Sequence, residues 1–256
     1  MSLEVKHLTI AIDTGIFPAQ DISFQIPNGK MLAIVGSSGA GKTTVCKAVM
    51  GLLGTSYTVT GEILFQSKNL LQLAPVELRK IYGNGICYIM QNPMTAFNPS
   101  IRIGKQLWRT YRLHHESSQR AEFDKRMDEI LQNLGLDDTK RILKSYPFAL
   151  SGGMLQRLMI AAALINQPHV LIADEATTAI DACNRAELMA ELRALCDKGM
   201  TILFVTHDLR AAAMADQILI MDHGHVVEAG TTKEILRSPK EEYTKRLLSA
   251  CVLERR

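Results

Sequence analysis

Three short apolar runs, at residues 31–35, 170–173 and 201–205, divide the chain into segments. None of them alternates between apolar and polar positions, which is typical of strands buried on both faces of a parallel sheet. Residues 44–53 follow the first run closely and have the pattern of a helix. The pattern therefore predicts a buried parallel sheet whose first strand leads through a loop into a helix.

Further short strands are expected at residues 3–10, 22–26 and 60–66, in antiparallel pairing, with Pro27-Asn28-Gly29 as a turn signal. A hairpin is expected from residues 217–221 and 226–228. The glycine of His223-Gly224-His225 suits the tight turn between them. We therefore interpret the two histidines of this triplet as turn residues rather than as a metal site.

Residues 104–146 are rich in charge and have a helical period. One face of a helix is formed by Phe123, Met127, Ile130, Leu131 and Leu134. Gly135 is expected to end that helix. A second helix is expected to carry Ile103, Leu107 and Tyr111, and a third Ile142 and Leu143. His114-His115 lies between the first two of these patterns, and we favour a solvated loop over a metal site for it.

Composition narrows the function classes. The chain has 256 residues and a net charge of +3, with lysine and arginine scattered, so nothing indicates nucleic acid as a partner. Weak attraction to a membrane surface is the alternative use of this charge. Five cysteines, at 46, 87, 183, 196 and 251, show no metal spacing, and we expect reduced, buried thiols. Without an apolar run of about eighteen residues or a signal peptide, the chain is not expected to span a membrane.

The glycine-rich loop between the first strand and its helix fits G-x-x-x-x-G-K-[ST]. Its glycines allow backbone N–H groups to approach phosphate oxygens, and the helix dipole attracts negative charge to the same place. Lys42 can reach the β- and γ-phosphates of a nucleotide, and the Thr43 hydroxyl can ligate Mg²⁺. The expected nucleotide-binding residues here are Gly36, Ser37, Ser38, Gly39, Ala40, Gly41, Lys42, Thr43 and Thr44.

Acidic and histidine side chains end the other two buried runs. Asp174 follows the second run and is placed to hold Mg²⁺, while Glu175 is the candidate base for an attacking water. His207 follows the third run, at the strand end where α/β sheets place ligand-binding groups. A lone histidine is more often structural, but this position favours a role in the site.

A second anion site is expected in Leu150–Arg157, where Ser151 is a good N-cap. Gly152 and Gly153 leave their N–H groups open to a γ-phosphate. One subunit has no need of two such sites. The sequence therefore favours an ATP site that a second copy of the protein completes.

These segments, in this order, resemble the ABC transporter ATPases over essentially the whole chain. Gly36–Thr43 corresponds to Walker A, Gln91 to the Q-loop, Leu150–Arg157 to the signature and Val170–Glu175 to Walker B. Ile180-Asp181 resembles the D-loop, and His207 the switch histidine. The resemblance implies an α/β P-loop NTPase fold with a RecA-like core sheet, a small antiparallel β subdomain and an inserted helical subdomain. Residues 1–95 and 150–256 would form the core with the β subdomain, and 96–149 the helical subdomain.

The resemblance also implies a mechanism and partners. Two ATP molecules would lie in a head-to-tail dimer, with Ser151, Gly153 and Asp181 acting across the interface and Thr43, Gln91 and Asp174 serving Mg²⁺. Glu175, His207 and Lys42 would be the catalytic residues. The partners would be a second ATPase subunit, identical or different, two transmembrane permease subunits and an extracytoplasmic binding protein. The subunit would lie peripherally on the cytoplasmic face of the inner or plasma membrane.

Three stretches resemble the dipeptide, oligopeptide and nickel importers in particular: residues 90–99, 146–153 and 238–248. The end at Arg256 and the Met-Leu-Gln-Arg signature resemble the nickel-import branch, with peptide import as the alternative. Chromosome-maintenance ATPases, ribosome-bound factors and exporters are disfavoured. The chain has no long coiled coil, only one cassette and no fused membrane helices.

Two departures from the family pattern concern the site. Ala176 replaces the usual proline after Walker B, which removes a restraint that would bias Glu175 to an extended backbone. The adenine contact has no evident tyrosine and is left open between Ile12 and Phe17.

Residues 92–99 are expected to form a docking groove for a permease helix, lined by Phe97 or Met94, with local packing as the alternative.

Overall fold

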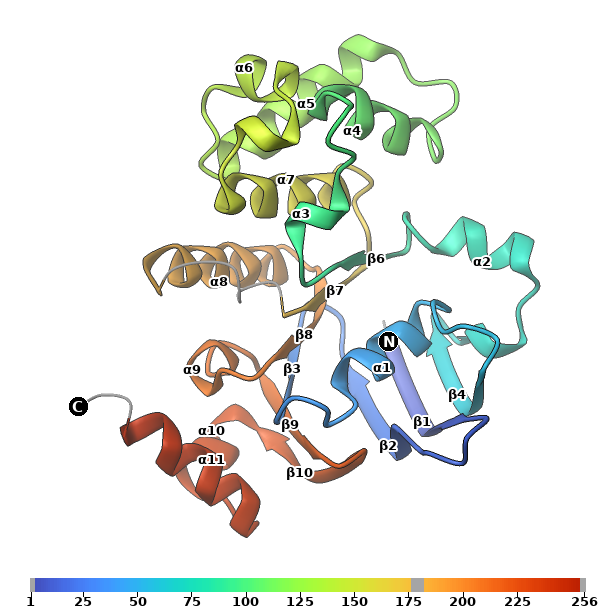
Figure 1. The fold of residues 1–256 in the computed structure, drawn as a ribbon, viewed down its shortest axis with the longest axis vertical. Coiled ribbons are helices and arrows are strands. Elements are labelled where there is room, and N and C mark those ends of the chain that lie inside the picture. The colour runs from blue at the N-terminus through green and yellow to red at the C-terminus, as the bar shows by residue number, and fades with distance from the viewer. Residues whose placement is uncertain (1–2, 176–181, 254–256) are drawn as a thin grey trace.

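The computed structural model describes residues 3–175 and 182–253. A six-stranded sheet, in the order β10-β9-β3-β8-β7-β6, crosses this part of the molecule (Figure 1). Its strands are β3 (Met31–Val35), β6 (Ile86–Ile89), β7 (Val170–Asp174), β8 (Thr201–Thr206), β9 (Gln217–Asp222) and β10 (His225–Thr231). All neighbours pair in parallel except β10 and β9. Every residue of β3, β7 and β8 is buried, so the strands predicted from the three apolar runs are confirmed.

A four-stranded antiparallel sheet lies beside it, in the order β2-β1-β4-β5. It consists of β1 (Leu3–Ile12), β2 (Ala19–Ile26), β4 (Tyr57–Phe65) and the short β5 (Lys68–Asn69). Helix α1 (Lys42–Val49) shares one hydrophobic cluster with this sheet and with one side of the parallel sheet. The expected antiparallel strands are confirmed, each longer than predicted at one end or both.

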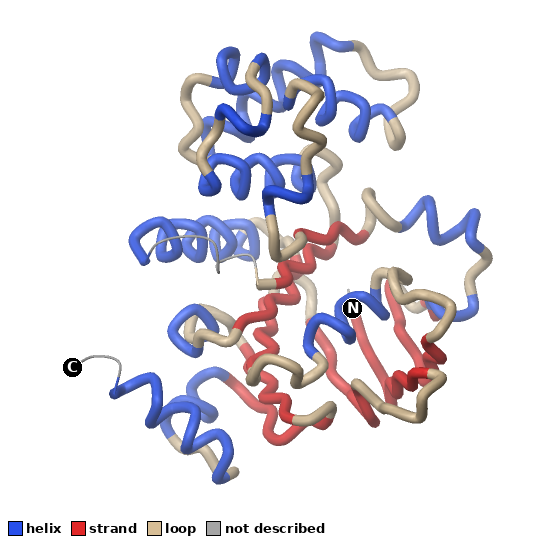
Figure 2. The backbone as a smooth tube through the Cα atoms, viewed as in Figure 1, coloured by secondary structure: helices blue, strands red, loops and turns tan. Residues whose placement is uncertain are grey.

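A group of helices, the helical layer, lies beyond the β6 end of the parallel sheet and packs against β6 (Figures 1 and 2). It contains α3 (Pro93–Ala96), α4 (Ile103–Arg112), α5 (Arg120–Asn133), α6 (Thr139–Lys144) and α7 (Gly152–Leu164). Phe123, Met127 and Leu131 of α5 are fully buried, which confirms the predicted apolar face. Gly135 follows the helix with a φ of 66° and turns the chain. Helices α3 and α7 pack against each other, and α7 also contacts β6, so the layer meets the core sheet through α7.

The histidine pair lies in the loop after α4, as expected, but it is less solvated than expected. Both side chains are half-buried, and the His115 ring stacks on Tyr111 with a centroid distance of 4.2 Å. In the described ranges no group of three or more His, Cys, Asp and Glu side chains is arranged to hold a metal ion.

The remaining helical elements lie in the connections between strands or after the last strand. They are η1 (Leu70–Gln72), α2 (Pro75–Ile81), η2 (Pro147–Ala149), α8 (Ala182–Asp197), α9 (Leu209–Ala212), α10 (Thr232–Arg237) and α11 (Glu242–Leu253). Within 3–175 and 182–253, no helix combines the length and apolar character needed to cross a membrane.

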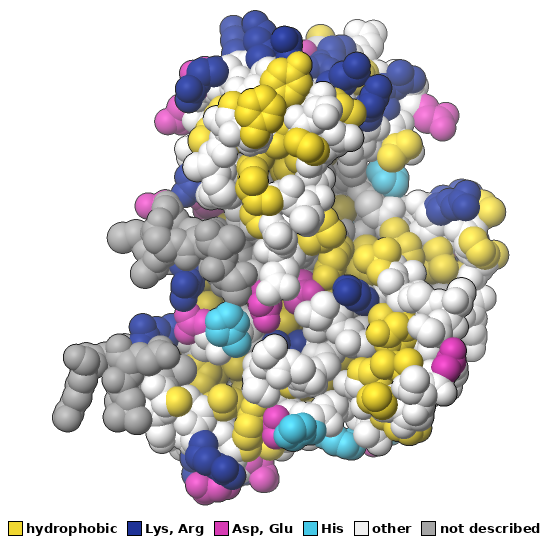
Figure 3. All heavy atoms as spheres, viewed as in Figure 1, with side chains coloured by type: hydrophobic (Ala, Val, Ile, Leu, Met, Phe, Trp, Pro, Cys, Tyr) yellow, Lys and Arg dark blue, Asp and Glu magenta, His cyan; other side chains and the backbone are white. Residues whose placement is uncertain are grey.

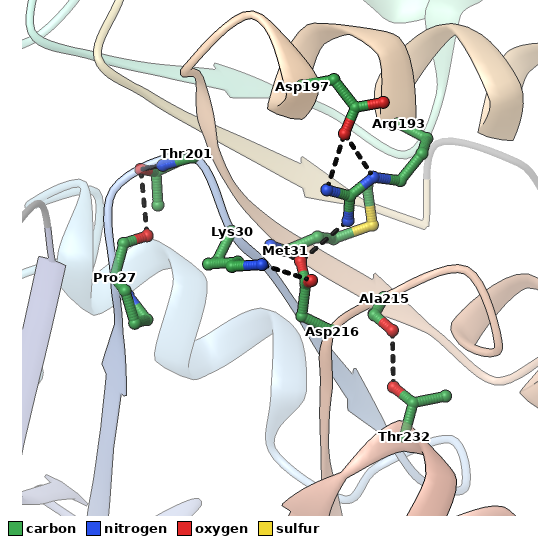
Figure 4. Close-up of polar contacts among 10 residues, drawn as sticks. Pro27, Lys30, Met31, Arg193, Asp197, Thr201, Ala215, Asp216 and Thr232 are labelled. Atoms are coloured by element: carbon green, nitrogen blue, oxygen red, sulfur yellow. Dashed lines mark hydrogen bonds and ion pairs between the residues drawn. The ribbon is translucent and has the colours of Figure 1, made fainter.

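A charged junction fastens α8 to the sheet (Figure 4). The Asp216 carboxylate accepts hydrogen bonds from the Met31 N–H at 2.9 Å, from Arg193 at 2.8 Å and from Lys30 at 3.1 Å. Arg193 lies on α8, whereas Asp216 precedes β9 and Met31 opens β3. The junction therefore holds three separate elements together. It lies at the end of the sheet opposite the glycine-rich loop that follows β3.

Candidate functional site

The loop after β3 is held so close to neighbouring backbone that only glycine fits at two of its positions. A Cβ atom at Gly36 would lie 2.1 Å from the Met221 carbonyl oxygen, and one at Gly41 would lie 2.1 Å from that of Pro18. Gly41 also has a φ of 96° and serves as the N-cap of α1 without a side-chain cap. The first N–H groups of α1 are therefore left for a ligand, as an anion site requires.

Lys42 is buried at the first position of α1, with 5% of its surface exposed. Its Nζ donates to the carbonyl oxygens of Gly36 at 2.9 Å and of Ser37 at 2.8 Å. Burial lowers the pKa of Lys42, while the nearby Glu175 and Asp174 carboxylates act in the opposite direction. The Lys42 side chain is thus bonded to the backbone of its own loop. To contact phosphate oxygens, it would have to break these hydrogen bonds.

Asp174 lies at the carboxyl end of β7 with 1% of its surface exposed. It accepts hydrogen bonds from the Thr43 hydroxyl at 3.1 Å and from the Tyr88 hydroxyl at 2.7 Å. Burial raises the pKa of Asp174, although these two hydrogen bonds lower it in part. The predicted pair of Thr43 and Asp174 therefore meets, and Tyr88 of β6 is a third member that the sequence analysis missed.

Glu175 lies between the side chains of Gln91 and His207, two other predicted site residues. Its carboxylate accepts a hydrogen bond from Gln91 Nε2 at 2.5 Å, and its second oxygen lies 3.8 Å from His207 Nδ1. The backbone of Glu175 is left-handed, with a φ of 48°. A proline after it would favour an extended backbone, so the alanine at 176 agrees with this conformation.

Ser151, at the start of α7, is exposed, and its hydroxyl accepts a hydrogen bond from the Met154 N–H at 3.3 Å, as an N-cap does. A Cβ atom at Gly152 or Gly153 would meet nothing within 4 Å. This helix N-terminus is therefore open. Among the hydrogen bonds and ion pairs of the described residues, none joins Ser151 or Gly153 to the phosphate loop. Asp181 lies outside the described residues.

Two further expectations concern apolar residues. Phe17 is 47% exposed, and the carbonyl oxygen of the next residue, Pro18, is the one that approaches Gly41. Phe17 thus lies beside the phosphate loop, as an adenine contact would, while Ile12 is half-buried in β1.

The expectation that Phe97 lines an exposed groove is wrong. It is 7% exposed and packs in the core, whereas Met94 is 57% exposed.

Comparison with known proteins agrees with this geometry. Residues 19–178 match the ABC transporter family profile. The metal-staphylopine import system ATP-binding protein CntD of Staphylococcus aureus is 41% identical over 252 residues, covering 96% of this chain and 92% of the relative. The oligopeptide transport ATP-binding protein OppD of Bacillus subtilis is 38% identical over 255 residues, covering 97% of this chain and 71% of the relative.

A solved structure is also similar. It is the dimeric, post-hydrolysis state of the ATP-binding cassette MJ0796 bound to ADP and Pi, with a TM-score of 0.81 and 27% identity. The similarity covers 90% of this chain and 98% of that one. The chain belongs to the ABC transporter family, and it is an ATP-hydrolysing subunit with the ABC ATPase fold. The expectation of an importer ATPase is thereby confirmed at the level of the family.

Proposed function

We propose that this chain hydrolyses ATP with Mg²⁺ at the cytoplasmic face of the inner membrane and so drives uptake of nickel or a metal chelate. Two permease subunits would form the path for the cargo, and an extracytoplasmic protein would bind it first. The observation that carries the proposal is the Gln91–Glu175 hydrogen bond. It joins the chemical site to the segment that leads into the helical layer.

The residues at the sheet edge suit a hard cation, because the Thr43 hydroxyl, the Gln91 amide and the Asp174 carboxylate all offer oxygen ligands. Thr43 and Gln91 would hold Mg²⁺ directly, and Asp174 would hold it through a water molecule. The ion would neutralise phosphate charge. Gln91 already donates through its nitrogen to Glu175, which leaves its carbonyl oxygen as the ligand atom.

The hydrolytic step assigns separate tasks to the nearby side chains. Glu175 would accept a proton from the attacking water, and His207 would hold the γ-phosphate. Lys42 would move from the loop carbonyls to the β- and γ-phosphates. Positioning and charge stabilisation supply most of the rate enhancement in such reactions.

Exposed apolar side chains near Gln91 in the sequence, and others just before α7, support contact with a permease. We define the docking surface as Met90, Met94, Tyr146 and Phe148, which are 38%, 57%, 36% and 73% exposed. The Tyr146 and Phe148 rings stack at 5.5 Å, and Arg102 lies over Tyr146 at 5.7 Å. Figure 3 shows hydrophobic side chains gathered over the helical layer on the viewed face. Exposed apolar side chains gathered in this way mark interaction sites.

The docking surface is tested with Phe148→Asp and Met94→Asp. Both side chains are exposed, so the variants should fold, bind ATP normally and fail to co-purify with the permease. Leu113→Asp is the matched control, since Leu113 is 75% exposed but lies elsewhere on the helical layer. Wild-type co-purification of both docking variants would exclude this surface.

The cargo is tested by uptake in cells that lack the gene. Complementation with the wild-type gene should restore accumulation of nickel supplied with a chelator, and the Glu175→Gln gene should not. The signature Met154-Leu155-Gln156-Arg157 and the relative named for metal-staphylopine import support this choice. Restoration of labelled dipeptide uptake, with metal uptake unaffected, would instead favour the alternative, a peptide importer, for which OppD is the similar protein.

A further inference from the structure

The C-terminal helix α11 reaches the phosphate loop through one tyrosine. The hydroxyl of Tyr243 accepts a hydrogen bond from the Ser37 N–H at 3.3 Å, across 206 positions of sequence. The same peptide group carries the Gly36 carbonyl, which accepts from Lys42 Nζ at 2.9 Å. One peptide group of the loop is therefore held at its N–H by Tyr243 and at its carbonyl by Lys42.

The start of α11 is itself fixed. The carboxylate of Glu228 on β10 accepts hydrogen bonds from the backbone N–H groups of Lys240 and Glu241, at 2.8 and 3.2 Å. Tyr243, Leu247 and Leu248 pack against the main hydrophobic cluster. The helix also contacts α9, the short helix that follows His207. Tyr243 thus projects from a firmly attached element rather than from a free end of the chain.

We propose that Tyr243 is a positioning residue for nucleotide binding. A glycine-rich loop has many backbone conformations, and ordering it costs conformational entropy when phosphate binds. A hydrogen bond that fixes the Gly36–Ser37 peptide lowers that cost before the nucleotide arrives. It also fixes the carbonyl on which Lys42 rests, so the lysine starts close to the phosphates that it will meet.

This inference rests on nucleotide binding by the chain and not on the identity of the cargo. It assigns a task to the tail segment around Tyr243, which has no part in the hydrolytic mechanism above. Because the hydrogen bond acts on the phosphate loop and not on the attacking water, its loss should weaken binding of ATP and ADP more than it slows the chemical step.

The direct test is Tyr243→Phe, which removes the hydroxyl and keeps the ring. We expect the Kd of ATP and the Kd of ADP to rise about three- to tenfold, which corresponds to the loss of one hydrogen bond. The maximal rate, kcat, should stay within about twofold. An unchanged Kd in this variant, with wild-type protein binding ATP normally, overturns the inference and leaves the proposed function intact.

A second pair of variants isolates the hydrogen bond. Ser37→Pro removes the N–H donor, and Ser37→Ala keeps it while removing the same hydroxyl. Tyr243→Phe should raise the Kd in the Ser37→Ala background and have no further effect in the Ser37→Pro background. An equal effect of Tyr243→Phe in both backgrounds would show that the hydroxyl acts through another group, and the inference would fail.

Leu247→Ala serves as the packing control on the same helix. It should lower the thermal unfolding midpoint, Tm, without changing the Kd of ATP. If it raised the Kd as much as Tyr243→Phe does, the effect would belong to the packing of α11 as a whole and not to the hydroxyl of Tyr243.

Discussion

At the scale of single residues, the two carboxylates that follow one another at the end of β7 have different surroundings. Asp174 is buried and accepts hydrogen bonds from two hydroxyl groups. Glu175 accepts from an amide that belongs to the exposed residue Gln91 and lies near the half-exposed His207. Asp174 therefore suits an electrostatic role next to a cation, and Glu175 suits proton transfer to and from a water molecule.

Replacement of Glu175 by Gln is expected to leave ATP binding intact and to lower kcat by about 10²- to 10⁴-fold. The amide keeps the size of the carboxylate and can still bond to Gln91, but it cannot accept a proton at neutral pH. ATP binding and steady-state hydrolysis by the purified variant measure the two effects. Undiminished hydrolysis would remove Glu175 from the role of base.

Replacement of Phe17 by Ala is expected to raise the Kd of ATP by about tenfold, the scale of one base–aromatic stacking contact. Phe17 is 47% exposed beside the phosphate loop, so its loss should cost little stability. Ile12→Ala is the control, because Ile12 is half-buried in β1. If only the Ile12 variant weakened binding, Ile12 would be the adenine contact.

The residues of the site divide into those that the sequence alone indicates and those that it does not. Lys42 was predictable from the glycine-rich loop motif. Asp174 and His207 were predictable because each stands at the end of a buried strand, and parallel strands bring these ends together. Tyr88 and Tyr243 were not, because each reaches the site from an element far away in sequence. Their hydroxyl groups follow no local pattern, so only the fold reveals them.

At the scale of elements, the junction at Asp216 joins α8, β3 and the start of β9 (Figure 4). Burial opposes the ionisation of Asp216, but the Met31 N–H, Arg193 and Lys30 outweigh it, so the pKa is lowered from 3.8 on balance. A lowered pKa in the folded state means that the ionised carboxylate stabilises the fold at neutral pH.

Asp216→Asn should therefore lower the free energy of unfolding by about 2 kcal/mol near pH 7, the scale of a hydrogen-bonded charged group. The difference from wild type should be fully present above the pKa of the unfolded chain. It should shrink as the pH falls and vanish below the lowered folded pKa. Denaturant unfolding at several pH values measures it.

Asp197→Asn is the matched control for this prediction. Asp197 also bonds to Arg193, but its side chain is 64% exposed, and such pairs contribute about 0.5 kcal/mol or less. An Asp197 variant as destabilised as the Asp216 variant would show that Arg193, rather than the half-buried Asp216 carboxylate, holds the junction together.

Phe97 illustrates at the same scale where a sequence pattern misleads. Two prolines flank it in a polar segment, which suggested an exposed loop. In the structure α3 packs on α7, and this contact turns Phe97 into the core while Met94, three residues earlier, stays outside. The amphipathic α5 was predictable because its apolar face repeats over several turns, whereas a single aromatic residue in a short segment has no such repeat.

At the scale of the whole molecule, the two proposed anion sites of the chain are separate. The phosphate loop follows the carboxyl end of β3, in the middle of the parallel sheet. The open N-terminus of α7 lies in the helical layer (Figure 1). Gly153 has free space around it, so a side chain there would not disturb the subunit itself. The geometry fits a site in which Ser151 and Gly153 of one subunit act on ATP held by Lys42 of another.

Mixing two inactive variants tests this arrangement, provided that the chain forms homodimers. Lys42→Ala removes the phosphate contact, and Gly153→Asp adds a carboxylate that repels the γ-phosphate. A mixed dimer has both lesions in one site and neither in the other, so an equal mixture should recover about a quarter of wild-type activity. Each variant alone should remain inactive. If confirmed mixed dimers also stay inactive, either the subunits do not share sites or both sites must be intact, and shared sites that work independently are excluded.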